Sequence, residues 1–210
     1  TLGQGSVLAA YKDTLLVGQG PRLTGVDPLR GTVRWEVAVG SPRGSNEVER
    51  LADLIGPAAR FGSTFCVRSF QSAVGCVDAE QGVLRWSRNI GGLQSVGGDD
   101  TVLVGADASD RITAWRQGTG EVAWANEKFL HRSLSGPMGA GKAIVFGDFR
   151  RGQVCGVQGR EDGVGGLAVS PARADDKARR VGALCGPELA QASSLLHAEL
   201  GELVVVAGQE

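Results

Sequence analysis

The chain has 210 residues, a formal net charge of −1 at pH 7 and 21% charged residues. This length supports a hydrophobic core for one large or two small domains, and the near-zero charge argues against a general affinity for nucleic acid or anionic membranes. No apolar run approaches the roughly 18 residues of a membrane-spanning helix. The first residues lack the basic and apolar regions of a signal peptide.

Short strands joined by tight turns are the expected local structure, because glycine is abundant, at 33 residues. Apolar runs bounded by Gly, Asp and Ser each predict the first strand of a β-hairpin. In chain order they are KDTLLVG (12–18), GSTFCVRSF (62–70), GDDTVLVG (98–105) and GKAIVFGDF (141–149). A second short strand follows, as SAVGCVD does after the second run.

An internal repeat organises these hairpins. Its copies are VDPLRGTVRW (26–35), VDAEQGVLRW (77–86), AWRQGTGEVAW (114–124) and the weaker GREDGVGGL (159–167). Units of roughly 40 residues with about four strands each are typical of a β-propeller. The sequence therefore predicts an all-β propeller of PQQ-type repeats with about four blades present.

The recurring tryptophans and glycines are predicted to have structural roles. The tryptophans are expected to fill the seams between blades, and the glycines four residues before them to permit the turn before the outer strand. The residues concerned are Trp35, Trp86, Trp124, Gly31, Gly82 and Gly120. Ligand stacking by the tryptophans is the less favoured alternative, since an identical register predicts an identical structural role.

A near-match to a phosphate-binding loop occurs in GPMGAGKAIVF (136–146), where Gly136, Gly141 and Lys142 fit the pattern but Ala143 replaces the hydroxyl residue. A phosphate loop requires a helix after it, whereas the repeat places a strand there. We therefore expect an ordinary turn at 141–142.

The composition changes after residue 163. Propeller blades are predicted over 1–163 and a divergent tail over 164–210, of which 164–200 is interpreted as a divergent or frame-shifted segment. In that tail, the spacing of leucines after Pro187 favours a helix over 187–200, and a final strand is expected over 202–207.

With the repeat in hand, the sequence resembles the family of the outer-membrane protein assembly factor BamB. The stretches GSNEVERLADL (44–54) and FLHRSLSGPMGAGKAIVFGDFRRGQ (129–153) carry the match beyond the generic repeat, and the resemblance covers about 1–163. It implies a non-enzymatic periplasmic scaffold without cofactor or metal. This scaffold would be lipid-anchored to the outer membrane and would bind the POTRA domains of BamA and other subunits of the assembly machinery.

The resemblance also implies residues of the partner interface. An acidic position of the family falls on Asp53, beside Arg50 in the same loop. A second acidic position is Ile55 here, and the family's Leu/Arg motif would fall at or before residues 1–3, where no Arg is present. The alternative for Arg50 and Asp53 is a solvated loop pair that contributes little to stability.

The family implies eight blades, so a chain with about four would be a fragment of such a propeller, a partial structure or one half of an assembly. The N-terminal blades, signal peptide and lipid-bearing cysteine would lie outside it. Such a half-propeller would leave an apolar face open at each end.

Cys66 and Cys76 flank a hairpin centred near Gln71 and are expected opposite each other on neighbouring strands. In the oxidising periplasm that the family implies, they could form a disulfide, and two buried thiols are the equal alternative.

Other functions are less favoured. A PQQ-dependent dehydrogenase fragment shares the repeat but requires adjacent cysteines, which this chain lacks. Neither His131 nor His197 belongs to a catalytic pattern. A PQQ-repeat protein with another protein partner remains the alternative, and it would show no affinity for POTRA domains.

Overall fold

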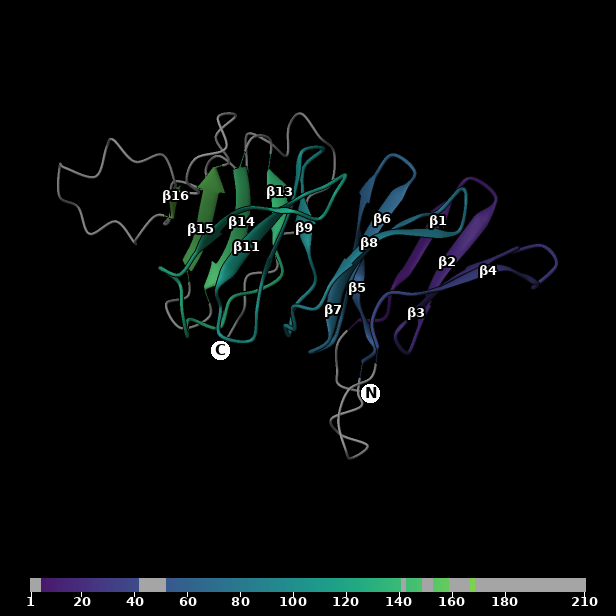
Figure 1. The fold of residues 1–210 in the computed structure, drawn as a ribbon, viewed down its shortest axis with the longest axis horizontal. Coiled ribbons are helices and arrows are strands. Elements are labelled where there is room, and N and C mark those ends of the chain that lie inside the picture. Colours follow the sequence, from purple (N-terminus) through teal and green to yellow (C-terminus); the bar gives the residue numbers. More distant parts are fainter. Residues whose placement is uncertain (1–4, 42–51, 141–142, 149–152, 159–166, 169–210) are drawn as a thin grey trace.

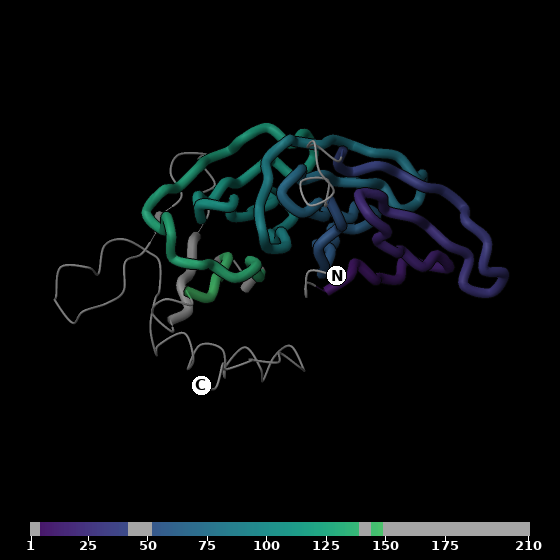
Figure 2. Tube along the Cα trace, turned by 90° about the horizontal axis from the view of Figure 1, so that it is seen from below, coloured from purple at the N-terminus to yellow at the C-terminus, as the bar shows by residue number. Residues whose placement is uncertain are grey.

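The computed structural model describes residues 5–41, 52–140, 143–148, 153–158 and 167–168. These residues form four antiparallel four-stranded sheets, which we number as blades 1 to 4 in chain order. The described parts of the chain contain no helix, and hence none long and apolar enough to cross a membrane. Figure 1 shows the blades following one another along the chain, and Figure 2 shows that they are arranged around an arc.

Within each blade the strands run in sequence order from the first strand to the fourth. Blade 1 comprises β1 (Leu8–Tyr11), β2 (Thr14–Gln19), β3 (Arg22–Val26) and β4 (Val33–Ala38). Blade 2 comprises β5 (Leu54–Phe61), β6 (Thr64–Ser69), β7 (Ala73–Asp78) and β8 (Val83–Arg88). Blade 3 comprises β9 (Gly97–Gly98), β10 (Val102–Ala106), β11 (Ile112–Arg116) and β12 (Val122–Asn126). Blade 4 comprises β13 (Met138–Ala140), β14 (Ala143–Asp148), β15 (Gln153–Gln158) and β16 (Leu167–Ala168).

This architecture confirms the all-β propeller fold. The four apolar runs expected as first hairpin strands correspond to β2, β6, β10 and β14. The strand β14 follows residues 141–142, as expected for a turn and not for a phosphate loop, although those two residues lie outside the described part. The predicted helix 187–200 and strand 202–207 also lie outside it, while β16 lies just past the predicted boundary at residue 163.

The core consists of the seams between blades. Strand β6 is buried along its whole length, because alternate side chains enter opposite seams. Phe65 and Val67 pack toward blade 1 with Leu16 and Leu23, whereas Cys66 packs toward blade 3. A central strand buried on both faces is what face-to-face packing of sheets requires.

Each of the first three blades carries a β-bulge at the same position of the repeat. In blade 1 the bulged residue is Arg34, which lies between the paired residues Val33 and Trp35. The bulge falls on Arg85 in blade 2 and on Ala123 in blade 3. A bulge re-aims the side chain of its extra residue, and this accounts for the arginine that precedes tryptophan in the first two copies.

That arginine pairs with the aspartate that begins the repeat. Arg34 Nη2 lies 3.1 Å from Asp27 Oδ2, and Arg85 Nη2 lies 2.5 Å from Asp78 Oδ2. The other carboxylate oxygen of each aspartate accepts two backbone N–H groups of the following turn. Blade 3 has neither member of this ion pair. Arg116 stands in the aspartate position and Ala123 in the arginine position.

Candidate functional site

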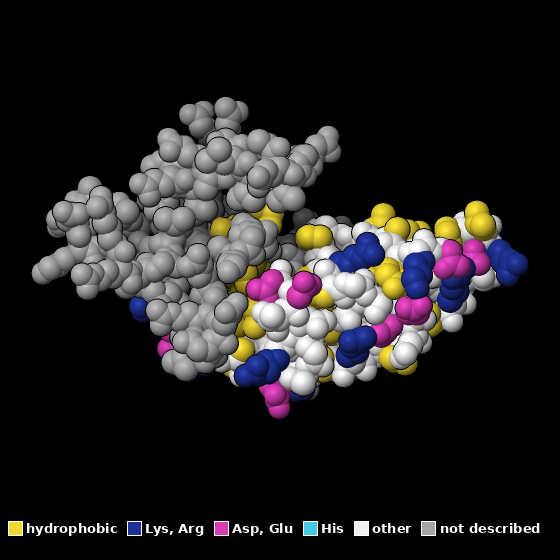
Figure 3. Space-filling view, turned by 90° about the horizontal axis from the view of Figure 1, so that it is seen from above, with side chains coloured by type: hydrophobic (Ala, Val, Ile, Leu, Met, Phe, Trp, Pro, Cys, Tyr) yellow, Lys and Arg dark blue, Asp and Glu magenta, His cyan; other side chains and the backbone are white. Residues whose placement is uncertain are grey.

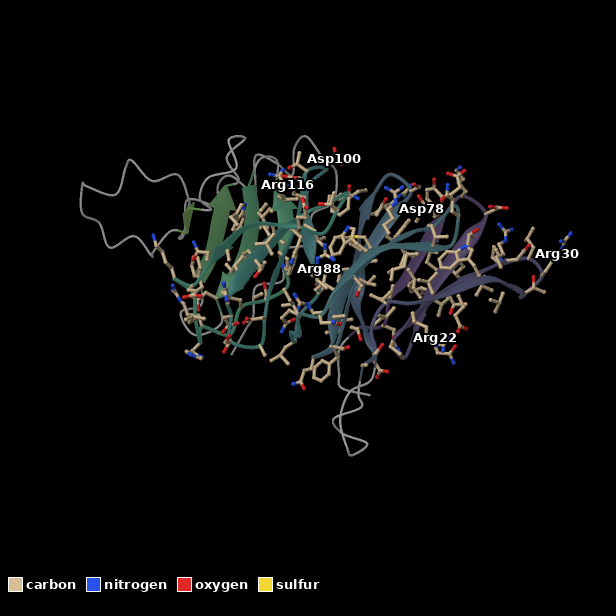
Figure 4. All side chains as sticks on the ribbon, viewed as in Figure 1. Arg22, Arg30, Asp78, Arg88, Asp100 and Arg116 are labelled. Atoms are coloured by element: carbon tan, nitrogen blue, oxygen red, sulfur yellow. A yellow bond between two sulfur atoms is a disulfide. The ribbon has the colours of Figure 1, made fainter. Side chains whose placement is uncertain are left out.

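The two ends of the propeller are formed by different parts of each blade. At one end, which we call the turn end, lie the tight turns that join the first strand to the second and the third to the fourth. At the other, the connection end, lie the turns between the second and third strands and the longer connections between blades. Figure 4 places Asp78, Asp100 and Arg116 toward the turn end and Arg22 toward the connection end.

Charges at the turn end are largely compensated. Figure 3 shows this end, with basic and acidic side chains interspersed over the described surface. Arg34 binds both Asp13 and Asp27, and these hydrogen bonds raise the pKa of its guanidinium. The hydrogen bond from Arg34, with those from the backbone N–H groups of Arg30 and Leu29, lowers the pKa of the Asp27 carboxyl. Paired charges of this kind give the turn end little net attraction for a charged partner.

The repeat tryptophans lie against glycines of the following blade. A Cβ built on Gly82 would lie 2.6 Å from Trp35 Cβ, and one built on Gly120 would lie 2.5 Å from Trp86 Cε3. Trp86 Nε1 donates to the Gln117 carbonyl, 2.8 Å away. Each contact therefore joins the outer strand of one blade to the turn of the next.

The repeat glycines also have positive φ, at +67° for Gly31, +67° for Gly82 and +68° for Gly120. This left-handed backbone favours glycine. Trp124 packs at the edge of the core between blades 3 and 4, and its counterpart Gly163 lies outside the described residues.

Asp53 lies at the connection end, where the chain enters blade 2 from blade 1. It is exposed, whereas its neighbours Ala52 and Leu54 are buried. Phe70 N donates to the Asp53 carbonyl at 2.8 Å, and Ser69 Oγ donates to the Ala52 carbonyl at 2.6 Å. The backbone of Asp53 is therefore held while its carboxylate is presented to solvent.

Of the other positions that the family resemblance marks, one lies outside the described residues and one is buried. Arg50 lies outside the described residues. Ile55, which occupies the second acidic position of the family, is 2% exposed within β5. Its apolar side chain therefore belongs to the core, and of the two acidic positions of the family only position 53 carries a carboxylate in this sequence.

The structure joins Cys66 and Cys76 in a disulfide. The two residues pair directly across β6 and β7, and both are buried in the seam between blades 2 and 3. They lie on the face of the sheet that packs against Trp115 and Leu103. The bridge thus joins the two central strands of blade 2 near the middle of their length.

A pocket of about 660 Å³ opens at the connection end between blades 2 and 3. Four separate segments line it: Gln71 from blade 2, residues 89–92 from the connection to blade 3, residues 107–109 from blade 3, and His131 from the next connection. Sequence reasoning did not find this pocket. Its residues do not recur in the repeat, so no periodic signal marks them.

Arg68 lies in the interior behind the pocket and was also missed. Its side chain is buried completely, and its Nη1 donates to the Ile90 carbonyl at 3.3 Å. Within the described part of the chain, its Nε and Nη2 atoms have no hydrogen-bond partner. Burial lowers the pKa of Arg68 to about 10, although the negative charge of Asp107 acts to raise it. The group is still a cation at neutral pH.

No group of three or more His, Cys, Asp or Glu side chains within the described ranges is arranged to hold a metal ion.

Comparison with known proteins places this architecture in a family. Residues 1–126 match the family described as "Outer membrane protein assembly factor BamB". The protein of that name from Burkholderia pseudomallei (strain K96243) is 32% identical over 148 residues, which cover 70% of this chain and 37% of that protein. The one from Bordetella pertussis (strain Tohama I) is 28% identical over 131 residues, which cover 62% of this chain and 34% of that protein.

Among solved structures, the crystal structure of BamB from Moraxella catarrhalis matches with a TM-score of 0.70 at 22% identity, covering 79% of this chain and 49% of that one. At this identity the likeness concerns the fold. The chain spans 37% and 34% of the length of the two curated relatives above. Since the family match extends over more than half of the chain, this protein belongs to the outer membrane protein assembly factor BamB family.

Proposed function

We propose that this chain is part of a non-enzymatic scaffold of the outer-membrane β-barrel assembly machinery, and that its connection end binds the POTRA domains of BamA. In the full-length protein, the scaffold acts at the periplasmic face of the outer membrane through a lipid anchor. Membership of an assembly-factor family supports the general role. The exposed carboxylate of Asp53 is the observation that supports the contact.

The geometry at Asp53 suits recognition. Its backbone carbonyl is fixed by Phe70 N, so presenting the side chain requires little further ordering of the chain. The residue also lies on a rigid propeller at the end of an inter-blade connection, which is where binding residues are commonly placed. An exposed carboxylate at such a site is complementary to a basic side chain of a partner.

A titration of the chain with the isolated POTRA domains of its cognate BamA tests the proposal. We expect Asp53→Arg to weaken binding at least tenfold, since charge reversal replaces an attractive contact by a repulsive one. Asp100→Arg is the matched control, because Asp100 is also an exposed aspartate but lies at the turn end. Circular dichroism checks that both variants keep the fold. Absence of binding by the unaltered chain, or equal effects of the two substitutions, contradicts the proposal.

A further inference from the structure

The pocket between blades 2 and 3 is continuous with the surface that carries Asp53. Phe70 N donates to the Asp53 carbonyl, and the next residue, Gln71, donates its N–H to the Gly92 carbonyl at 3.1 Å. Ser72 Oγ donates to the Ser41 carbonyl at 3.0 Å. The turn at 69–72 therefore links the entry to blade 2 with the wall of the pocket.

Three polar side chains of the pocket are unengaged. Among the described residues, the side chains of Gln71, Asn89 and His131 have no hydrogen-bond partner, although all three are exposed at the pocket. Gln71 and His131 have positive φ, at +48° and +59°. Their backbones are nevertheless fixed, since His131 N donates to the Ser109 carbonyl at 3.0 Å and Gln71 N is bonded to Gly92. Positive φ also occurs in a tight turn away from the pocket, at Lys12, so at Gln71 it reflects the turn between β6 and β7.

Charge in and behind the pocket is balanced. Asp107 contributes a carboxylate, but its Oδ1 accepts the N–H and the hydroxyl of Ser109, at 2.8 and 2.7 Å, and the N–H of Arg111 at 3.0 Å. The buried guanidinium of Arg68 lies behind it. With one charge of each sign, the pocket favours neither an acidic nor a basic ligand. The side-chain amides of Gln71 and Asn89 are neutral donors and acceptors.

Part of the pocket is lined by main-chain atoms of Gly91 and Gly92, which have no side chains. A Cβ on Gly91 would lie 2.8 Å from the Gln71 carbonyl oxygen, and one on Gly92 would lie 2.7 Å from the Ala106 carbonyl oxygen. Leu93 and Leu130 adjoin the lining residues Gly92 and His131 and are 39% and 38% exposed. The site thus combines the neutral side-chain amides of Gln71 and Asn89 with the backbone of Gly91 and Gly92.

We propose that this pocket binds an extended segment of the partner protein that docks on Asp53, through hydrogen bonds from Gln71, Asn89 and His131 to its main-chain amides. Peptide amides are neutral and offer both donors and acceptors, which matches the unengaged groups of the pocket. This inference rests on the proposed function, because it assigns a second contact to the same partner.

The test is the affinity of a double variant, Gln71→Ala with Asn89→Ala, for the isolated POTRA domains of the cognate BamA. Loss of two neutral hydrogen bonds is expected to raise the Kd about tenfold. The matched control is Gln81→Ala, an exposed amide side chain at the turn end. Since the amides are neutral, the effect of the double variant is expected to persist in 0.5 M NaCl, whereas the effect of Asp53→Arg is expected to shrink.

The outcomes separate the two proposals. If Asp53→Arg abolishes binding but the double variant binds like the unaltered chain, the pocket inference is overturned and the proposed function stands. If the unaltered chain does not bind, the proposed function and the pocket inference both fail. An effect of the double variant that disappears at high salt also overturns the inference, because it indicates recognition of charge. Circular dichroism of each variant excludes loss of the fold as the cause.

Discussion

Replacement of Gly120 by alanine is expected to destabilise the protein far more than the same replacement at Gly31. Both residues have nearly the same backbone, with φ of +68° and +67°. In this left-handed region an alanine costs about 1–2 kcal/mol. Nothing lies within 4 Å of a Cβ built on Gly31, whereas one built on Gly120 overlaps the indole of Trp86. Overpacking adds about 1–3 kcal/mol, and displacement of the Trp86 Nε1 hydrogen bond adds about 1 kcal/mol.

We therefore expect a loss of about 1–2 kcal/mol for Gly31→Ala and of about 3–6 kcal/mol for Gly120→Ala. Urea unfolding followed by far-ultraviolet circular dichroism measures both. In a Trp86→Leu background, which removes the indole, the cost of Gly120→Ala is expected to fall toward the Gly31 value. Equal costs at Gly31 and Gly120 in the unaltered background would refute the assignment of Trp86 to the seam between blades 2 and 3.

Three further outcomes follow from the blade contacts. Burial raises the pKa of the Asp78 carboxyl, but the hydrogen bonds from Arg85 and two backbone N–H groups outweigh it, so the pKa lies below its ordinary value of 3.8. The contribution of Asp78 to the free energy of unfolding is complete above pH 3.8 and is lost as the pH falls below it. Asp78→Ala is expected to remove this acid dependence and to lower the free energy of unfolding by about 2 kcal/mol at pH 7. Urea unfolding at several pH values measures both effects. Reduction of the Cys66–Cys76 disulfide is expected to lower the free energy of unfolding by about 2–3 kcal/mol, because the bridge closes only a short loop. Thiol labelling under denaturing conditions, before and after reduction, checks that the disulfide was present. Arg68→Met is expected to leave the urea midpoint unchanged or raise it, because it removes a buried cation that forms no salt bridge with another described residue. A clear decrease would show that Arg68 stabilises the seam.

The sequence was sufficient to predict the blades because the same physical requirement recurs in each. A positive-φ turn favours glycine, and a seam between blades favours a large apolar side chain such as that of Trp86. The aspartate and the arginine of the repeat could be identified from the sequence. Their pairing was not evident, since it depends on a bulge at Arg34 that no residue type specifies.

The connection end was less accessible to sequence reasoning. Asp53 was found through a family resemblance, and its role remains a prediction. The pocket was not found because its lining comes from four segments that are far apart in the chain and occur once each. Arg68 was missed for another reason: an arginine in a strand is ordinarily expected on a solvent face, whereas here both faces of β6 are buried.

Site-specific photocrosslinking tests the central claim, that the connection end docks on the assembly machinery, most directly. A benzophenone amino acid is placed at position 53 or, as the control, at position 100, and each variant is irradiated with the POTRA domains of the cognate BamA. The account predicts a crosslinked product from position 53 and none from position 100. Crosslinking from position 100 alone, or equally from both positions, would contradict it.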